Sequence, residues 1–205
     1  MAADDGEVVV VVHGFASIRL WMLPLCWRLR SHGYRVINWG YPSLRRNMAA
    51  HAARFYEYIS KSLVHERRIH IVAHSMGAIV VRAALSEGAV ANLGRIVLLA
   101  PPNRGTPAAR LAAPLFGRLF RGIADLSDRA DSAACRLPAE CSLDLGVLAA
   151  RFDLLVPVSH THVAGESDHL VLNASHNSLL LSPAPARLAA TFLKSGRFER
   201  CGSKR

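Results

Sequence analysis

Lysine is almost absent from this chain. Lys61, Lys194 and Lys204 are the only lysines among 25 basic residues, so arginine carries nearly all of the positive charge. With 15 acidic residues the formal net charge is +10, a balance that suits nucleic acid or an anionic surface. The arginines are scattered through helix-like segments without interleaved aromatic residues, which argues against nucleic acid as the partner. Weak attraction to a membrane surface or to acidic substrates stays open.

Cysteines are also few, and no two of them form a CxxC pair. The lack of that spacing argues against a zinc or redox site. Cys135 and Cys141 flank a short loop and would pair in an oxidising compartment. Four free thiols in a reducing cytoplasm is the preferred interpretation. The four residues are Cys26, Cys135, Cys141 and Cys201.

Long apolar runs are missing as well. The N-terminus, MAADDGEVVVVVHGF, is acidic where a signal peptide would be basic, and its valine run is too short to span a bilayer. We therefore expect a cytoplasmic protein. The 205 residues, 51% of them hydrophobic, suit one domain over residues 1–205 with a single substantial core.

Strand-like and helix-like segments alternate along the chain. This alternation predicts an α/β protein with a central, mostly parallel sheet of about six or seven strands flanked by helices. Strands are predicted at Glu7–Val12, Tyr34–Trp39, Arg68–Ala73, Gly94–Ala100, Leu143–Ala149 and within His162–Leu172. Helices are predicted at Ser17–His32, Met48–Val64, Met76–Ser86 and Ser182–Lys194.

Residues 101–142 interrupt this alternation. Long excursions in compact domains are usually functional, and in such sheets they lie over the carboxyl ends of the strands. We therefore expect a lid or cap, with one amphipathic helix at Ala109–Phe120. Its apolar residues have helical spacing, which favours packing within the cap over a lipid-facing stripe. They are Leu111, Leu115, Phe116, Leu119 and Phe120.

The sharpest motif is Ala73-His74-Ser75-Met76-Gly77, between a predicted buried strand and a predicted helix. This is the context of the G-x-S-x-G nucleophile elbow, with alanine in place of the first glycine. Serine before a helix is also a common N-cap, but the strand–turn–helix context favours Ser75 as a nucleophile. The neighbouring His74 is a candidate substrate contact.

Acyl chemistry also needs two N–H donors for the developing oxyanion. One is expected from Met76, the residue after the serine. The other is expected from Phe15, because His13-Gly14-Phe15 follows the first strand and its glycine lets the backbone turn outward. A plain turn at Gly14 is the alternative interpretation.

The acid and the base should follow the serine in the order Asp or Glu, then His. His176 lies in a polar loop before the last helix, where a mobile imidazole is expected, whereas His169 lies inside a strand-like run. Asp153 follows a predicted strand and is favoured as the acid over Asp168, because the acid must orient the base from a separate loop. Asp144 and Glu166 are less favoured candidates for the acid. His160 and His162 are further histidines after the serine, and they lie on a strand-like segment.

Together these motifs resemble a family of small bacterial α/β-hydrolases, broadly esterases and lipases. The resemblance covers nearly the whole chain and is weakest across Arg118–Ser142. It rests on VVHGF, VINWGYPS, AHSMGAIVVRAAL, LLAPPNRGT, FDLLVPVSHTHVAGESDHLVLNASHNSLL and FLKSGRF.

The resemblance implies hydrolysis of acyl esters by a Ser-Asp-His triad of Ser75, Asp153 and His176, with no metal and no cofactor. The family's acidic motif, Asp-Gly-x-Val, reads Asp-Leu-Leu-Val here, and the lost glycine bears on the loop geometry, since leucine avoids a positive φ. The pair Asp168-His169 matches a motif expected to be structural. The stretch Pro101–Thr106 should shape the cleft, with Asn103 or Arg104 touching substrate.

Two rival functions stay open. An alcohol or thiol could capture the acyl-enzyme, which would make an acyltransferase or a thioesterase. A non-catalytic lipid-binding protein with the same fold is the alternative from another class. The expected partner is a small acyl ester or a lipid, and a short chain with a small cap favours a carboxylesterase over an interfacial lipase.

Overall fold

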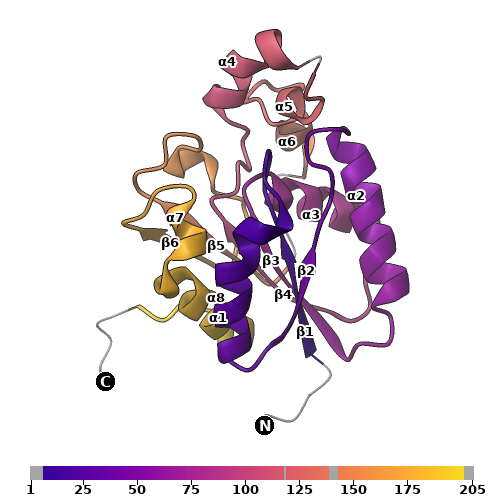
Figure 1. Cartoon of the computed structure of the whole chain (residues 1–205), viewed down its shortest axis with the longest axis vertical. Coiled ribbons are helices and arrows are strands. Elements are labelled where there is room, and N and C mark those ends of the chain that lie inside the picture. The colour runs from indigo at the N-terminus through magenta and orange to yellow at the C-terminus, as the bar shows by residue number, and fades with distance from the viewer. Residues whose placement is uncertain (1–6, 118, 139–142, 201–205) are drawn as a thin grey trace.

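The computed structural model describes residues 7–117, 119–138 and 143–200. Helices cover both faces of a central sheet, and the 101–138 segment stands beyond one end of the strands (Figure 1). A pairing of Cys135 with Cys141 involves a residue outside the described ranges. Within the described ranges, no helix combines the length and the apolar character needed to cross a membrane.

The sheet has six strands, all parallel, in the order β2-β1-β3-β4-β5-β6. The predicted α/β class and parallel sheet are confirmed. Because β1 lies between β2 and β3, the chain changes direction across the sheet at β1 and β3, and the carboxyl ends of these strands border the crevice where such folds bind ligands. The strands are β1 Glu7–Val12, β2 Arg35–Trp39, β3 Arg68–His74, β4 Leu93–Leu99, β5 Leu145–Ala150 and β6 Asp168–Leu172.

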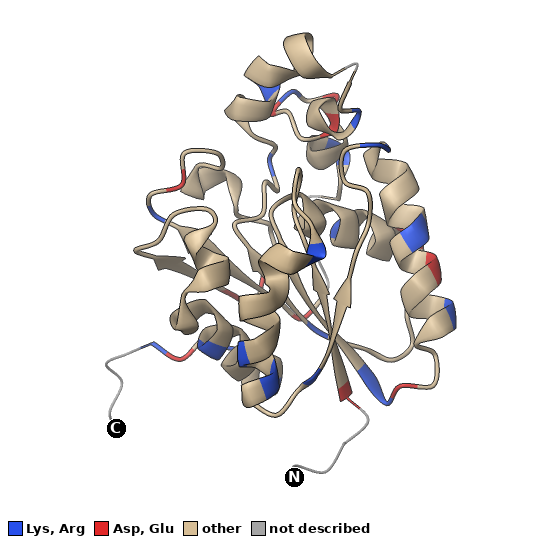
Figure 2. Ribbon diagram, in the orientation of Figure 1, with Lys and Arg blue, Asp and Glu red and all other residues tan. Residues whose placement is uncertain are grey.

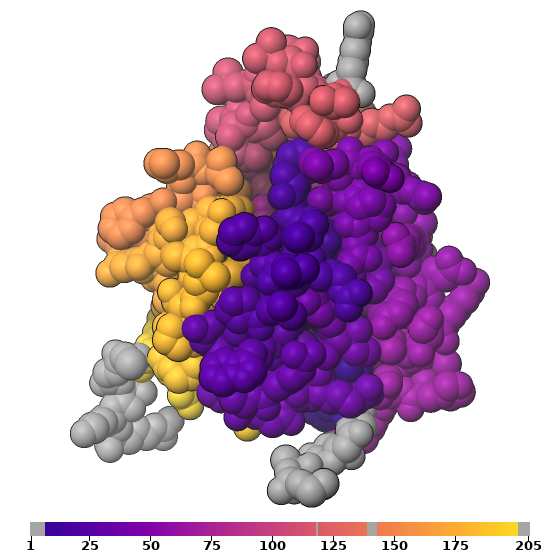
Figure 3. All heavy atoms as spheres, in the orientation of Figure 1, coloured from indigo at the N-terminus to yellow at the C-terminus, as the bar shows by residue number. Residues whose placement is uncertain are grey.

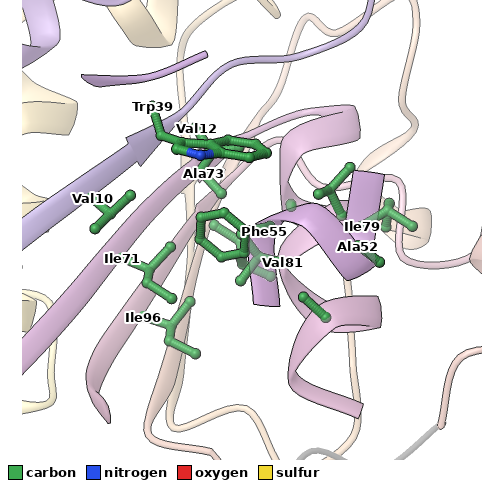
Figure 4. Packing of buried hydrophobic residues seen from close by; sticks show 14 of the residues in the cluster. Val10, Val12, Trp39, Ala52, Phe55, Ile71, Ala73, Ile79, Val81 and Ile96 are labelled. Atoms are coloured by element: carbon green, nitrogen blue, oxygen red, sulfur yellow. The ribbon is translucent and has the colours of Figure 1, made fainter. Parts of the chain in front are cut away.

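The valine run of β1 explains the layered core. All five valines are 0% exposed, and side chains alternate between the faces of a strand. Val8, Val10 and Val12 pack with one helix layer, and Val9 and Val11 pack with the other. The first layer is α2 Met48–Glu57 and α3 Met76–Glu87, with Phe55 against the strands and Ile79 beside Ala52 among the helices (Figure 4). The second layer is α1 Leu23–Ser31, α7 Ser178–Leu181 and α8 Pro183–Ser195.

The predicted helices are present, but two of them are subdivided. The first begins with a 3-10 turn, η1 Arg19–Met22, before α1. The second ends in a π turn, η2 Tyr58–Ser62, after α2. The predicted strand-like segment at His160 and His162 is instead a 3-10 turn, η3 Val158–His160, followed by a loop up to β6.

The described part of the excursion, residues 101–117 and 119–138, contains three helices joined by loops, and we call this segment the cap. Phe120 packs edge-on against Phe15, with ring centroids 6.3 Å apart, and the Asp125 carboxylate accepts the Met48 N–H at 2.7 Å. These contacts fasten the cap to the turn after β1 and to the start of α2. The helices are α4 Pro107–Phe116, α5 Gly122–Asp125 and α6 Ala133–Arg136.

The expected packing of the apolar stripe on the first cap helix is wrong for most of its members. Leu111, Leu115 and Leu119 are 73%, 79% and 71% exposed, and α4 buries none of its residues. Helical spacing shows that apolar residues share one face, but only neighbouring elements can bury that face. Here only Phe120, at the end of the stripe, finds such a neighbour.

Candidate active site

Ser75 occupies a sharp turn between β3 and α3. Its backbone has φ 53° and ψ −126°, a conformation that non-glycine residues rarely adopt and that costs energy unless the surroundings impose it. The turn is held by hydrogen bonds from the Ser75 N–H to the Leu99 carbonyl and from the Ala78 N–H to the Ser75 carbonyl, both 2.9 Å. The Ser75 side chain makes no capping hydrogen bond, so the N-cap interpretation leaves its hydroxyl unexplained.

The residues around the turn must be small because larger side chains would clash with neighbouring atoms. A Cβ on Gly77 would lie 2.4 Å from the His13 carbonyl oxygen, and a Cβ on Gly14 would lie 2.9 Å from the Ser75 Cβ. The helix therefore packs directly on the end of β1. Ala73, which replaces the first glycine of the motif, is fully buried in the core beside α2 and α3, so its methyl group is accommodated.

The expected oxyanion donors lie beside the serine. Met76 is the first residue of α3, where a backbone N–H has no acceptor within the helix. Phe15 belongs to the turn after β1, and Gly14 and Phe15 line the same cavity as Ser75. Their role as oxyanion donors stays a prediction.

Asp153 and His176 meet at the carboxyl ends of β5 and β6. The Nδ1 atom of His176 lies 2.6 Å from Oδ2 of Asp153, and the two side chains are only 10% and 1% exposed. An ionised carboxylate only accepts hydrogen bonds, so Nδ1 carries the proton. This tautomer leaves Nε2 as an acceptor, which a general base requires.

The Asp153 carboxylate is held in its charged form. Burial alone would raise its pKa, but the hydrogen bonds from the His176 ring and from the Val156 and Leu155 N–H groups outweigh burial and hold the pKa below its usual value. The two backbone N–H groups bind Oδ1 at 2.9 and 2.8 Å.

The Leu-Leu sequence of this loop fits without backbone strain. Among the described residues only Ala16, Ser75 and Ala100 have positive φ without being glycine, so Leu154 and Leu155 avoid the conformation that leucine disfavours. The Asp153 carboxylate organises the turn instead. Leu154 is 96% exposed and points its side chain away from the core.

His74 has a clear structural partner that sequence reasoning missed. Its Nε2 lies 3.1 Å from the His176 carbonyl oxygen, so Nε2 donates and steadies the loop that carries His176. Burial lowers the pKa of His74 to about 3, which keeps the ring neutral. His74 also lines the cavity, so its predicted contact with substrate stays a prediction.

The cavity at Ser75 has a volume of about 350 Å³. Ser75 and His176 both line it, and most of the remaining wall is apolar. Trp21 and the leucines were not identified from the sequence, because their segments show only ordinary helix and loop patterns. The lining residues are Gly14, Phe15, Ala16, Ser17, Trp21, His74, Ser75, Leu155, His176, Asn177, Leu180 and Leu181.

Asn103 and Arg104 do not line this cavity. The buried Asn103 amide accepts from Arg82 at 2.9 Å and donates to the Thr161 carbonyl at 2.6 Å. It therefore ties the start of the cap to α3 and to the loop after η3. Arg104 is exposed, and its backbone N–H binds the His160 carbonyl. A substrate contact by either residue stays a prediction.

The competing acids lie at the opposite ends of their strands. Asp168 begins β6 and accepts hydrogen bonds from the Phe198 N–H and from Arg200, at 2.8 and 3.0 Å. Asp144 precedes β5 and pairs with Arg95 at 2.6 Å. Both carboxylates therefore bind groups near the C-terminal segment and lie far along the strands from Ser75.

One group in the described part of the chain has three metal-ligand atoms within 4.8 Å of one another, from His162, Glu166 and His169. Its two imidazoles stack at 3.8 Å with 16° between the planes, so their lone pairs run side by side instead of converging. Both oxygens of Glu166 accept hydrogen bonds, from His162 and from the Val163 N–H. This arrangement does not fit a metal, and none of the three residues lines the Ser75 cavity.

A model of the alpha/beta hydrolase family matches residues 9–192. The chain therefore belongs to the α/β-hydrolase family, in agreement with its sheet and its strand–turn–helix serine. A search of curated proteins returned no match.

Solved structures with the same fold include esterases and lipases. The phospholipase PlaB from Legionella pneumophila aligns with a TM-score of 0.73 at 14% identity, over 93% of this chain but only 58% of PlaB. A thermophilic esterase from Thermogutta terrifontis aligns at 0.67 and 17% identity, over 93% and 90% of the two chains. The lipase BlEst2 from Bacillus licheniformis aligns at 0.66 and 16% identity, over 93% and 91%.

Proposed function

We propose that this chain is a serine hydrolase that cleaves carboxylic esters through an acyl-enzyme on Ser75. The observation that carries the proposal is the shared cavity of Ser75 and His176, with His176 held by a buried Asp153 at 2.6 Å. A strained serine that shares a cavity with an oriented imidazole is an arrangement that suits nucleophilic catalysis. Family membership and the esterase and lipase neighbours support it.

In the proposed reaction, Nε2 of His176 takes the hydroxyl proton as Ser75 attacks the ester carbonyl. Asp153 fixes the imidazole tautomer and stabilises the imidazolium that forms. The N–H groups of Met76 and Phe15 bind the oxyanion of the tetrahedral intermediate. His176 then protonates the leaving alcohol, and a water molecule, activated by the same imidazole, releases the acid.

The cavity wall indicates which part of an ester it would hold. Phe15, Trp21, Leu155, Leu180 and Leu181 offer apolar surface, so the acyl chain is the expected occupant. Apolar cavities with a few convergent polar groups are typical of small-molecule sites. A small acyl ester or a lipid is therefore the proposed substrate.

Fluorophosphonate labelling and hydrolysis of a short p-nitrophenyl ester test the proposal together. Ser75→Ala should lose both, whereas Ser17→Ala, a serine in the same cavity, should keep both. Labelling that persists in Ser75→Ala would refute the assignment, and an unlabelled wild-type protein would favour a non-catalytic binding protein. Product analysis with competing alcohols and thiols separates a hydrolase from an acyltransferase, and thioester substrates test for a thioesterase.

A further inference from the structure

The mouth of the Ser75 cavity is surrounded by exposed apolar side chains. Trp21, Leu155 and Leu181 line the cavity and are nevertheless 59%, 48% and 48% exposed. Soluble proteins expose single apolar residues routinely, but a contiguous group of large ones marks an interaction surface. These three come from three separate segments, η1, the Asp153 loop and α7, and each segment contributes to the cavity lining.

Further exposed residues extend this group along the same segments. Ile18, Leu20 and Leu23 are close to Trp21 in the sequence, and Phe152 and Leu154 are close to Leu155, all of them at least 48% exposed. Ile18 and Leu20 line a second hollow with Tyr41 and Pro42. We call this set, with Trp21, Leu155 and Leu181, the apolar rim. Tryptophan at such a position is characteristic of lipid interfaces, where an amphipathic ring lies at headgroup depth.

The cap adds a second apolar surface that is linked to the cavity. Phe15 in the cavity wall contacts Phe120, whose ring centroid lies 6.5 Å from that of Phe116 at the end of α4. From there the exposed face of α4 continues through Leu115 and Leu111. Figure 3 shows this cap segment standing above the residues that follow β1.

The charges at this end of the molecule favour an anionic partner. Its aspartates are engaged, since Asp128 pairs with Arg110 and Asp131 with Arg129, and Asp125 and Asp153 accept the hydrogen bonds given above. Figure 2 shows basic positions in the cap and in the loops below it. Several exposed arginines in the segments that follow the strands have no ion-pair partner among the described residues: Arg19, Arg45, Arg46, Arg104, Arg121 and Arg151.

We propose that the apolar rim and the exposed face of α4 dock on the surface of an anionic lipid bilayer, with the cavity mouth facing the lipid. Apolar side chains would enter the headgroup boundary while the arginines bind anionic headgroups. Docking itself does not depend on catalysis. The further conclusion, that the bilayer is the source of substrate, rests on the proposed hydrolase function.

Vesicle flotation of the full chain tests the docking directly. Vesicles of phosphatidylglycerol and phosphatidylcholine should carry the protein to the top of the gradient, and pure phosphatidylcholine vesicles should carry much less. Raising the salt to about 1 M shortens the screening length from about 10 Å to about 3 Å and should release much of the bound protein. Absence of binding to anionic vesicles overturns the proposal.

Matched variants locate the surface. Leu20→Ser and Leu115→Ser should each lower vesicle binding by roughly tenfold. Val64→Ser should leave binding unchanged, since Val64 is also exposed, at 55%, but lies in the loop before β3 at the other end of the sheet. Arg121→Gln should weaken binding to anionic vesicles. Arg187→Gln, at an exposed arginine of α8, is its control and should leave binding unchanged. Equal losses in Val64→Ser would refute the assigned surface.

Two readouts separate this proposal from its rivals. Hydrolysis of a water-soluble ester should be unchanged in Leu20→Ser and Leu115→Ser. A wild-type protein that binds vesicles but hydrolyses no ester would refute the proposed function and leave the docking proposal intact. Light scattering with vesicles absent reports self-association. A dimer that Leu115→Ser dissociates, together with no vesicle binding, would show that the surface serves a second copy of the chain and would overturn lipid docking.

Discussion

Replacing Asp153 by asparagine is the sharpest test of the candidate triad. The change keeps the size of the side chain and removes one charge. In the structure Oδ1 accepts two backbone N–H groups, from Leu155 and Val156, while Oδ2 faces Nδ1 of His176. An asparagine at this position can therefore direct either its amide oxygen or its NH₂ group toward the imidazole.

The two backbone N–H donors of Leu155 and Val156 determine the orientation of the amide. With the amide oxygen on the two N–H groups, the NH₂ group points at His176 and donates to Nδ1. The proton of His176 then moves to Nε2, which can no longer accept a proton from Ser75. The flipped amide would place its NH₂ group against two backbone donors and lose both hydrogen bonds, at about 1 kcal/mol or more for each. The unproductive tautomer is thus favoured.

We expect Asp153→Asn to lower kcat by about 10³ to 10⁴-fold, or about 4 to 5.5 kcal/mol in the activation barrier. KM for a short p-nitrophenyl ester should change little, because Asp153 does not line the cavity. The matched control is Asp168→Asn, which alters the other candidate acid and should keep kcat. The reasoning is refuted if Asp153→Asn keeps more than a tenth of the wild-type kcat, or if Asp168→Asn loses as much.

Three more outcomes follow from the geometry. Gly77→Ala should lower the free energy of unfolding by about 3 kcal/mol in urea titrations, because its Cβ would lie 2.4 Å from the His13 carbonyl oxygen; a stable variant would contradict that contact. Burial lowers the pKa of His74 to about 3 in the folded state, so between about pH 6.5 and pH 3 the unfolded chain binds a proton that the folded protein does not, and the free energy of unfolding falls as the pH falls. His74→Gln should reduce this decline by up to about 1.4 kcal/mol per pH unit; an unchanged slope would show that the ring is not buried. Leu154→Gly should leave kcat within about twofold of wild type, because Leu154 needs no positive φ and is 96% exposed; a large gain in kcat would show that the Leu-Leu loop is strained.

The parts of the fold that local pattern determines were predictable from the sequence. Five consecutive valines permit little besides a strand buried on both faces, and the turn at Ser75 is confined by the strand before it and the helix after it. The pairing of Asp153 with His176 was reached by chain order and loop position. Its geometry depends on two strands that pair only in the folded sheet, β5 and β6.

Features that depend on tertiary neighbours were not predictable. The exposed stripe on α4 has the same spacing as a buried one, and only the absence of a covering element distinguishes the two. The bond from His74 to the His176 carbonyl joins residues 102 positions apart, and no local signal marks it. The wall formed by Trp21 and Leu181 likewise arises where three segments meet.

The position of each proposed triad member in the sheet has a consequence for how the proposed activity would be lost on heating. Ser75 follows β3, a central strand, and its N–H is bonded to the end of β4. His176 follows β6, which has a neighbour on one side only among the described strands. Edge elements open at lower free energy than central ones, so a local opening of β6 would displace His176, the proposed base, while Ser75, the proposed nucleophile, keeps its conformation. Heat inactivation would then report the fraying of one strand, at temperatures where most amide protons of the sheet still resist exchange.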